Sequence, residues 1–198
     1  MARNVGLFGG SFNPPHVCHT MTSLWAMHTH PLDEVWWMPT YQHAFGKQLV
    51  SFEERMRMCE LATRTLQGVR TVEVERELGG ESRTVDTVAH LQARHPDTNF
   101  WLIVGADIMA ETHKWKDWEG LMQRVRLILI GRMGHQQAEL EARGVHFTLP
   151  DISSTDIRAR LAAHGTQDPR LAQWVDARVL SHIDQNGLYG PGPQGPSS

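Results

Sequence analysis

Two histidines that follow a run of small residues are the first candidates for chemistry. The run Gly9-Gly10-Ser11-Phe12-Asn13-Pro14-Pro15-His16 comes directly after the apolar stretch 4–8 and before a helical stretch. Glycines let a backbone approach a ligand closely, and a helix N-terminus turns unpaired N–H groups toward an anion. His16 and His19, three residues apart at that terminus, are expected to reach the same anion. The segment predicts a site for the phosphates of a nucleotide, ATP being the expected ligand.

A second segment near the end of the chain repeats this arrangement. It reads Asp151-Ile152-Ser153-Ser154-Thr155-Asp156-Ile157-Arg158. Its hydroxyl residues are good helix N-caps, and Ser154 and Arg158 would share one face of the helix, one turn apart. Arginine can bind phosphate through two parallel hydrogen bonds. Such an N-cap is common by itself, but together with the first segment it predicts a second group of phosphate ligands.

Strands that alternate with helices would have to bring these two segments together. We expect strands at 4–8, 34–38, 70–74, 99–104, 126–130 and 145–149, and helices at 17–29, 52–65, 85–94 and from residue 154 onward. This alternation predicts the α/β class: one doubly wound, Rossmann-like domain over residues 1–189, with a parallel sheet and a helical C-terminal portion. Ligands of such sheets bind beyond the carboxyl ends of the strands. The Gly- and Pro-rich tail 190–198 is expected to be disordered.

The composition excludes several classes of partner. The chain has 198 residues, of which 40% are hydrophobic, and a formal net charge of -3, which fits one globular domain without general attraction to nucleic acid or anionic membranes. No run approaches the ~18 apolar residues of a membrane span. Cys18 and Cys59 lack metal-ligand spacing, and no secretory signal precedes them, so we expect a cytoplasmic protein. The sequence leaves open whether the chain forms homo-oligomers.

The two phosphate segments together resemble the nicotinate mononucleotide adenylyltransferase family. This family belongs to the nucleotidyltransferase superfamily, which carries a His-x-Gly-His box and a C-terminal Ser-Ser-Thr-x-Ile-Arg box. Two internal segments strengthen the resemblance. The stretch 81–87 is similar to the family's Ser-Tyr-Thr-x-Asp-Thr segment, and Gly105-Ala106-Asp107 with Lys114-Trp115 is similar to its Gly-Ala-Asp and Lys-Trp pair. The resemblance runs through nearly the whole chain.

The resemblance implies transfer of AMP from ATP to nicotinate mononucleotide, which gives deamido-NAD and pyrophosphate in NAD biosynthesis. It implies catalytic roles for His16, His19, Lys47 and Arg158. It implies ATP contacts for Gly9, Gly10, Ser11, Phe12, Asp107, Ser153, Ser154 and Thr155. Contacts with the pyridine nucleotide are implied for Arg83, Thr84 and Trp115. Mg²⁺ is expected to arrive on the ATP phosphates, without a metal site built from protein side chains.

Three positions depart from the family pattern. Cys18 replaces the glycine of the first box, which would add a side chain beside the adenosine, and Arg83 replaces a tyrosine. The loop 42–47 ends in Lys47 without the usual Pro-His-Lys run. Transfer to nicotinamide mononucleotide or phosphopantetheine, a CTP-dependent reaction, and a catalytically weak nucleotide-binding regulator therefore remain alternatives. Thr84 and Trp115 disfavour the phosphopantetheine and CTP alternatives.

Overall fold

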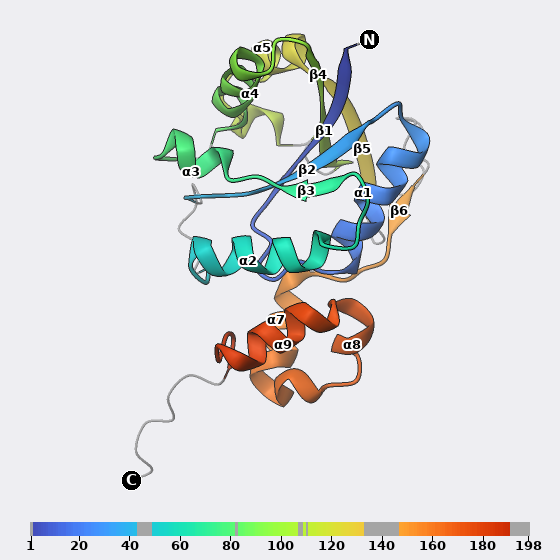
Figure 1. Cartoon of the computed structure of the whole chain (residues 1–198), viewed down its shortest axis with the longest axis vertical. Helices are drawn as coiled ribbons and strands as arrows, with labels where there is room; N and C mark the ends of the chain where they lie inside the picture. The colour runs from blue at the N-terminus through green and yellow to red at the C-terminus, as the bar shows by residue number, and fades with distance from the viewer. Residues whose placement is uncertain are drawn as a thin grey trace.

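A six-stranded parallel sheet forms the centre of the molecule (Figure 1). The computed structural model describes residues 2–42, 49–81, 83–106, 109, 111–132 and 147–190. The strand order is β3-β2-β1-β4-β5-β6, and every neighbouring pair is parallel. The strands are β1 (Arg3–Gly10), β2 (Glu34–Pro39), β3 (Val69–Thr71), β4 (Thr98–Gly105), β5 (Arg126–Arg132) and β6 (Thr148–Leu149).

The direction in which strands are added reverses between β1 and β4. From β1 the chain adds β2 and β3 on one side, and β4, β5 and β6 follow on the other. The register aligns Gly10 with Pro39 and Gly105 with Ile130, so the carboxyl ends lie at one edge of the sheet. Such a reversal opens a crevice between the loops that follow the two central strands, where ligands of doubly wound sheets bind. The predicted fold class is confirmed, and the site is expected beyond β1 and β4.

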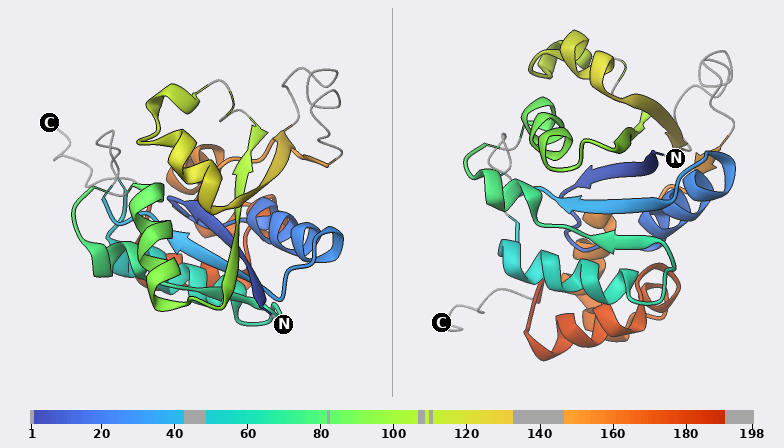
Figure 2. Two further views of the ribbon diagram at one scale, coloured as in Figure 1. Left: turned by 90° about the horizontal axis from the view of Figure 1, so that it is seen from above. Right: turned by 45° about the horizontal axis from the view of Figure 1, so that its top comes forward.

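Helices cover both faces of the sheet (Figures 1 and 2). On one side are α1 (Val17–Thr29) and α2 (Phe52–Thr63), with the C-terminal helices packed against them: α7 (Ser154–His164), α8 (Leu171–Trp174) and α9 (Ala177–Gln185). On the other side are α3 (Val74–Leu78), α4 (Thr84–Arg94) and α5 (Trp118–Arg124). Two 3₁₀ turns, η2 (Thr112–Lys114) and η3 (Gly165–Gln167), complete the described elements. None of the described helices has the length and apolar character needed to cross a bilayer.

Alternation along the strands explains the two cores. Trp36 and Met38 pack with α3, α4 and α5, whereas Val35 and Trp37 face the core shared by α1, α2 and the C-terminal helices. Successive side chains of a strand point to opposite faces, so a strand that is apolar throughout is buried on both. The apolar stretches of the sequence therefore predicted the central strands and their position in the interior.

Two local predictions were wrong. The third strand was expected to reach residue 74, but β3 ends at Thr71 and Val74 begins α3. Val74 is only 4% exposed, and its burial against α4 outweighs the strand preference of a valine. The first strand was expected to end at residue 8, but it continues through Gly9 and Gly10, which pair with β2. The helices α3 and α5 were not anticipated, and residues 191–198 of the tail lie outside the described residues.

Candidate active site

The segment after β1 turns at Phe12 rather than at the glycines. Phe12 has a φ of +46°, and its ring is 1% exposed and stacked on Trp37 with centroids 5.0 Å apart. The buried ring anchors the turn, so Phe12 can offer a nucleotide only its main chain. At Gly9, by contrast, a Cβ added to the backbone would meet no atom of the described residues within 4 Å. The main chain at Gly9, near the carboxyl end of β1, is therefore accessible to a ligand.

The histidine pair lies together at the start of α1. His16 is the N-cap, His19 is the third residue of the helix, and their ring centroids are 4.0 Å apart. The main-chain N–H of His16 donates to Nδ1 of His19 at 3.0 Å. Because that nitrogen accepts, the proton of a neutral His19 ring sits on Nε2, which makes Nε2 a donor. The predicted proximity of the pair is confirmed, and its ligand remains a prediction.

The second box folds onto the first. The Ser154 hydroxyl donates to the carbonyl oxygen of Pro14 at 2.9 Å, and Arg158 Nη1 donates to that of Asn13 at 2.8 Å. These contacts join positions 140 and 145 residues apart in the sequence. The convergence expected of the two segments is confirmed, since the guanidinium is bonded to the same segment that ends at His16.

Capping of α7 also follows the sequence pattern. Ser153 is its N-cap, and the Ser153 hydroxyl accepts from the main-chain N–H of Asp156 at 3.2 Å. Thr155 is exposed, and its hydroxyl accepts from Nη2 of Arg158 at 3.3 Å. Arg158 is thus held at both terminal nitrogens. Two fixed points orient the plane of the guanidinium before any substrate arrives.

The cysteine of the first box takes part in the junction between the boxes. Cys18 is 4% exposed, and its Sγ lies 3.7 Å from the carbonyl oxygen of Pro150, within reach of a thiol hydrogen bond. Pro150 immediately precedes the segment that leads into α7. The side chain that replaces the family's glycine is therefore packed between α1 and this segment.

The residues expected to meet the pyridine ring lie on two segments that an ion pair connects. Thr84 is the first residue of α4, and Trp115 follows η2. Lys116, next to the tryptophan, pairs with Asp86 in the first turn of α4 at 2.7 Å. The two segments are therefore neighbours, as a shared pyridine site requires. The contact of each residue with a pyridine ring stays a prediction.

Two side chains near this second subsite already have protein partners. Trp115 is half-buried and meets Trp118 edge-on, with centroids 5.7 Å apart. Arg83 is exposed and pairs with Glu81 at 2.6 Å. Contact between Arg83 and a mononucleotide would have to compete with this surface ion pair, which in solvent contributes little.

The first subsite, where the histidine pair meets Ser154 and Arg158, gathers donors that suit an anion. They are two imidazoles, a guanidinium and a helix N-terminus, all of which stabilise negative charge. Among the described residues, no three acidic, histidine or cysteine side chains are grouped as a metal site requires. Of the predicted site residues, Lys47 and Asp107 lie outside the described part of the chain.

Two residues that the sequence patterns did not single out contact the first segment near its buried Asn13. Asn13 is 1% exposed, and Arg55, at 2% exposed, donates to the carbonyl oxygens of Ser11 and Val50. Burial lowers the pKa of Arg55. The burial of Arg55 could have been predicted from the sequence, because Arg55 shares the helical spacing of the apolar residues of α2 and therefore falls on the buried face of that helix. Nothing in the sequence signalled Tyr189, whose hydroxyl donates to Asn13 Oδ1 at 2.7 Å.

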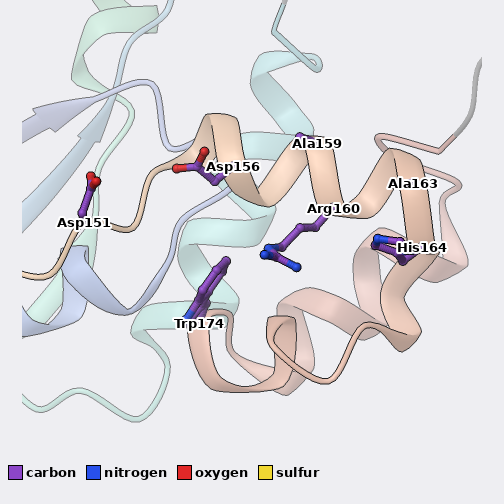
Figure 3. Close-up of a pocket in the computed structure, with 7 residues that line it drawn as sticks. All are labelled: Asp151, Asp156, Ala159, Arg160, Ala163, His164 and Trp174. Atoms are coloured by element: carbon purple, nitrogen blue, oxygen red, sulfur yellow. The ribbon is translucent and has the colours of Figure 1, made fainter.

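A cavity of about 370 Å³ lies between α7 and α8 (Figure 3). Arg160 and Trp174 face each other there, with the guanidinium carbon 5.1 Å from the ring centroid. Residues two apart on a helix point about 200° away from each other, so Arg160 projects opposite to Arg158. The cavity therefore lies mainly on the face of α7 opposite Arg158, although Asp151 and Asp156 of the second box also line it.

Comparison with known proteins agrees with this geometry. Residues 7–160 match the family model described as cytidylyltransferase-like. A protein of Anaeromyxobacter dehalogenans named a probable nicotinate-nucleotide adenylyltransferase is 46% identical over 190 residues, which cover 94% of this chain and 97% of that protein. A Myxococcus xanthus protein of the same name is 40% identical and covers 96% of each chain.

The fold has a solved counterpart in nicotinic acid mononucleotide adenylyltransferase from Plasmodium falciparum, determined in complex with NaAD. The TM-score is 0.77, and the match covers 94% of this chain and 97% of that one. At 19% identity this likeness supports the fold alone. Sequence identity to the bacterial relatives decides the family: the chain belongs to the cytidylyltransferase-like nucleotidyltransferases and, within them, to the nicotinate-nucleotide adenylyltransferases.

Proposed function

We propose that the protein transfers AMP from ATP to nicotinate mononucleotide, releasing pyrophosphate and forming deamido-NAD. The observation that carries the proposal is the convergence of Ser154 and Arg158 on the segment 13–14, directly before the histidine pair. The names of its bacterial relatives support this choice of substrates.

The reaction requires little from the protein beyond positioning the two substrates and stabilising the charge on the transferring phosphate. The 5′-phosphate of the mononucleotide is already an anion, so it can attack the α-phosphorus of ATP without a strong general base. In-line attack displaces pyrophosphate, and negative charge accumulates on the oxygens of the transferring group. Alignment of the two substrates and preorganised donors for that charge supply the rate enhancement.

The residues of the first subsite would divide this task. His19 would donate from Nε2 to the transferring phosphate, and His16 would hold the phosphates beside it. Arg158, with Lys47, would bind the β- and γ-phosphates. The main chain of residues 9–12 and the hydroxyl residues Ser153, Ser154 and Thr155 would surround the rest of ATP. A donor that is already oriented, as Arg158 is by its two hydrogen bonds, needs no reorganisation in the transition state.

The second subsite would hold the acceptor. The face of Trp115 would stack on the electron-poor, formally cationic pyridinium, which the π electrons of an indole attract. Thr84, at the N-terminus of α4, would meet the pyridine nucleotide from the other side, with Arg83 near its carboxylate or phosphate. Asp107 would contact the ribose hydroxyls of ATP.

Mg²⁺ would be carried by the substrate. The side chains named at the first subsite are imidazole, guanidinium and hydroxyl groups, which fit phosphate oxygens, and none of them is a carboxylate, the side chain through which proteins mainly bind Mg²⁺. Bound to ATP, Mg²⁺ would neutralise the polyphosphate through phosphate oxygens and water. The two cysteines are buried thiols, which fits the reducing cytoplasm where we expect the reaction to occur.

The proposal is tested by pyrophosphate release in the presence of Mg²⁺. ATP and CTP are each combined with nicotinate mononucleotide, its amide, and phosphopantetheine. We expect the highest kcat/KM for ATP with nicotinate mononucleotide. Equal or greater turnover with CTP, or no turnover with any pyridine nucleotide, would overturn the assignment.

A further inference from the structure

Asn13 is the residue at which three distant parts of the chain contact the segment before the histidine pair. Its main-chain oxygen accepts from Arg158, while its side-chain Oδ1 accepts from the Tyr189 hydroxyl at 2.7 Å and from the main-chain N–H of Val50 at 3.3 Å. Asn13 is 1% exposed. The residue therefore links α7, the approach to α2 and the end of the chain.

The orientation of the Asn13 amide follows from these partners. A main-chain N–H can only donate, so the atom facing Val50 must be the oxygen. Nδ2 of Asn13 is then buried, and it has no hydrogen-bond partner within the described part of the chain. Burying a donor without a partner costs free energy. The two hydrogen bonds that Oδ1 accepts therefore hold the side chain in this orientation despite that cost.

Arg55 closes the network from the α2 side. Its Nη1 donates to the carbonyl oxygen of Ser11 at 3.1 Å, and its Nε donates to that of Val50 at 3.2 Å. A buried guanidinium is tolerated when its N–H groups are satisfied. Because the main-chain N–H of Val50 in turn donates to Asn13, Arg55 is linked to the segment 11–13 twice: directly at Ser11, and through Val50 at Asn13.

Tyr189 is the member of the network that comes from outside both boxes. It lies just after α9, and its ring packs against the core shared with α2. Burial raises the pKa of Tyr189, so its hydroxyl stays protonated and acts as a donor throughout the neutral range. The contact with Asn13 spans 176 residues, so it forms only when the C-terminal helices are docked.

We propose that Tyr189 is a positioning residue for adenylyl transfer, and that it acts by fixing Asn13. With Asn13 fixed, the carbonyl oxygen that anchors Arg158 and the histidine pair that follows are held in one geometry. An error of less than an ångström in such donors weakens transition-state stabilisation while leaving ground-state binding nearly intact. The inference rests on the proposed function, because it assigns the residue a part in that reaction.

The first test is Tyr189→Phe in the full-length chain. The phenylalanine ring keeps the packing and loses the hydroxyl, so we expect kcat to fall about tenfold while KM for ATP changes by no more than about twofold. Thr166→Val is the matched control. It deletes another hydroxyl of the C-terminal helices, which donates to Asp184 at 2.8 Å and has no contact with the segment 11–14. The control should retain the kcat of the unmodified chain.

A double-mutant cycle separates positioning from general stability. Asn13→Ala removes the acceptor, so it should lower kcat itself, and adding Tyr189→Phe should then lower kcat little further. If the fall in kcat of the double variant equals the product of the two single falls, or if Tyr189→Phe leaves kcat unchanged while the unmodified chain is active, the positioning role is overturned. Should either variant fail to fold, the cycle is run with Tyr189→Leu, which also lacks the donor, and with Asn13→Ser, whose side chain is shorter. Inactivity of the unmodified chain toward every acceptor would instead overturn the proposed function.

Discussion

Nη1 of Arg158 lies 2.8 Å from the carbonyl oxygen of Asn13, although 145 residues separate the two in the chain. The same guanidinium donates through Nη2 to Thr155, so two points fix its plane. The segment that provides the carbonyl ends at His16. One hydrogen bond therefore connects the principal cation of the second box with the histidine pair of the first.

Replacement of Arg158 by lysine should show that this geometry matters more than the charge. Lysine keeps the positive charge but lacks the planar fork, so we expect kcat/KM to fall ~100-fold, the scale of losing one preorganised donor. Steady-state pyrophosphate release measures the effect. Arg160→Lys is the control, since Arg160 lies on the opposite face of α7 and pairs with Asp168. Equal activity of the two variants would contradict the role given to Arg158.

His19→Ala tests the histidine pair. The variant loses the Nε2 donor, so we expect kcat to fall ~100-fold or more. It also loses the acceptor for the main-chain N–H of His16, which should lower the free energy of unfolding by about 1 kcal/mol, as for other N-terminal caps. His28→Ala, on the exposed side of the same helix, should change neither quantity appreciably. A near-normal kcat for His19→Ala would exclude the proposed role.

Periodicity and apolar runs were sufficient to predict the fold class and most elements. The helix α1 has the bounds expected from the sequence, Val17–Thr29. The prediction failed where tertiary contacts decide the local structure. Valine prefers strands, but the burial of Val74 outweighs that preference and places the residue in a helix. The turn after β1 depends on the stacking of Phe12 on Trp37, which no local sequence pattern indicates.

The sequence predicted the residues of the candidate site better than it predicted the hydrogen bonds between them. The residue types of the two boxes indicated phosphate binding, and their convergence followed from the sheet topology. Neither feature indicated that Arg158 and Ser154 bond to main-chain oxygens of the first segment. Contacts such as Tyr189 with Asn13 join distant positions through single hydroxyl groups, and a sequence shows them only once the fold has placed both residues.

Cys18→Gly would restore the family's residue and should destabilise this protein. The variant removes a buried side chain and its contact with the Pro150 carbonyl, and it places glycine in the first turn of α1. Loss of buried apolar surface together with the backbone entropy of glycine is worth about 1–3 kcal/mol. Urea unfolding measures the change, and Cys18→Ala should lose less because it keeps a Cβ. Unchanged stability of Cys18→Gly would show that the packing of the thiol contributes nothing.

Trp115→Leu should weaken the acceptor site alone. Leucine fills part of the space but has no π face, so we expect KM for nicotinate mononucleotide to rise about tenfold, in line with a stacked cation on an indole. KM for ATP should stay within about twofold, because the two subsites bind different substrates. Trp174→Leu, in α8, is the matched control and should leave both KM values unchanged. A parallel rise in both KM values for Trp115→Leu would indicate a structural role for this tryptophan.

The carboxylate of Asp168 should make stability depend on pH in the acid range. It accepts from the main-chain N–H of Arg170 at 2.9 Å and from Arg160 at 3.0 Å, and these hydrogen bonds, the main-chain one foremost, hold its pKa below the usual value. A depressed pKa in the folded state means stabilisation that is complete above the pKa of the unfolded chain. It is lost as the pH falls through the lower pKa of the folded state.

Asp168→Asn should therefore lower the free energy of unfolding at neutral pH, and the difference from the unmodified chain should shrink below about pH 4, near the ordinary pKa of an aspartate. Urea unfolding of both proteins at a series of pH values measures this convergence. Asp97→Asn removes the same charge from an exposed position and controls for net charge. A difference that stays constant from neutral to acid pH would mean that packing of the side chain, and not its ionisation, is what Asp168 contributes.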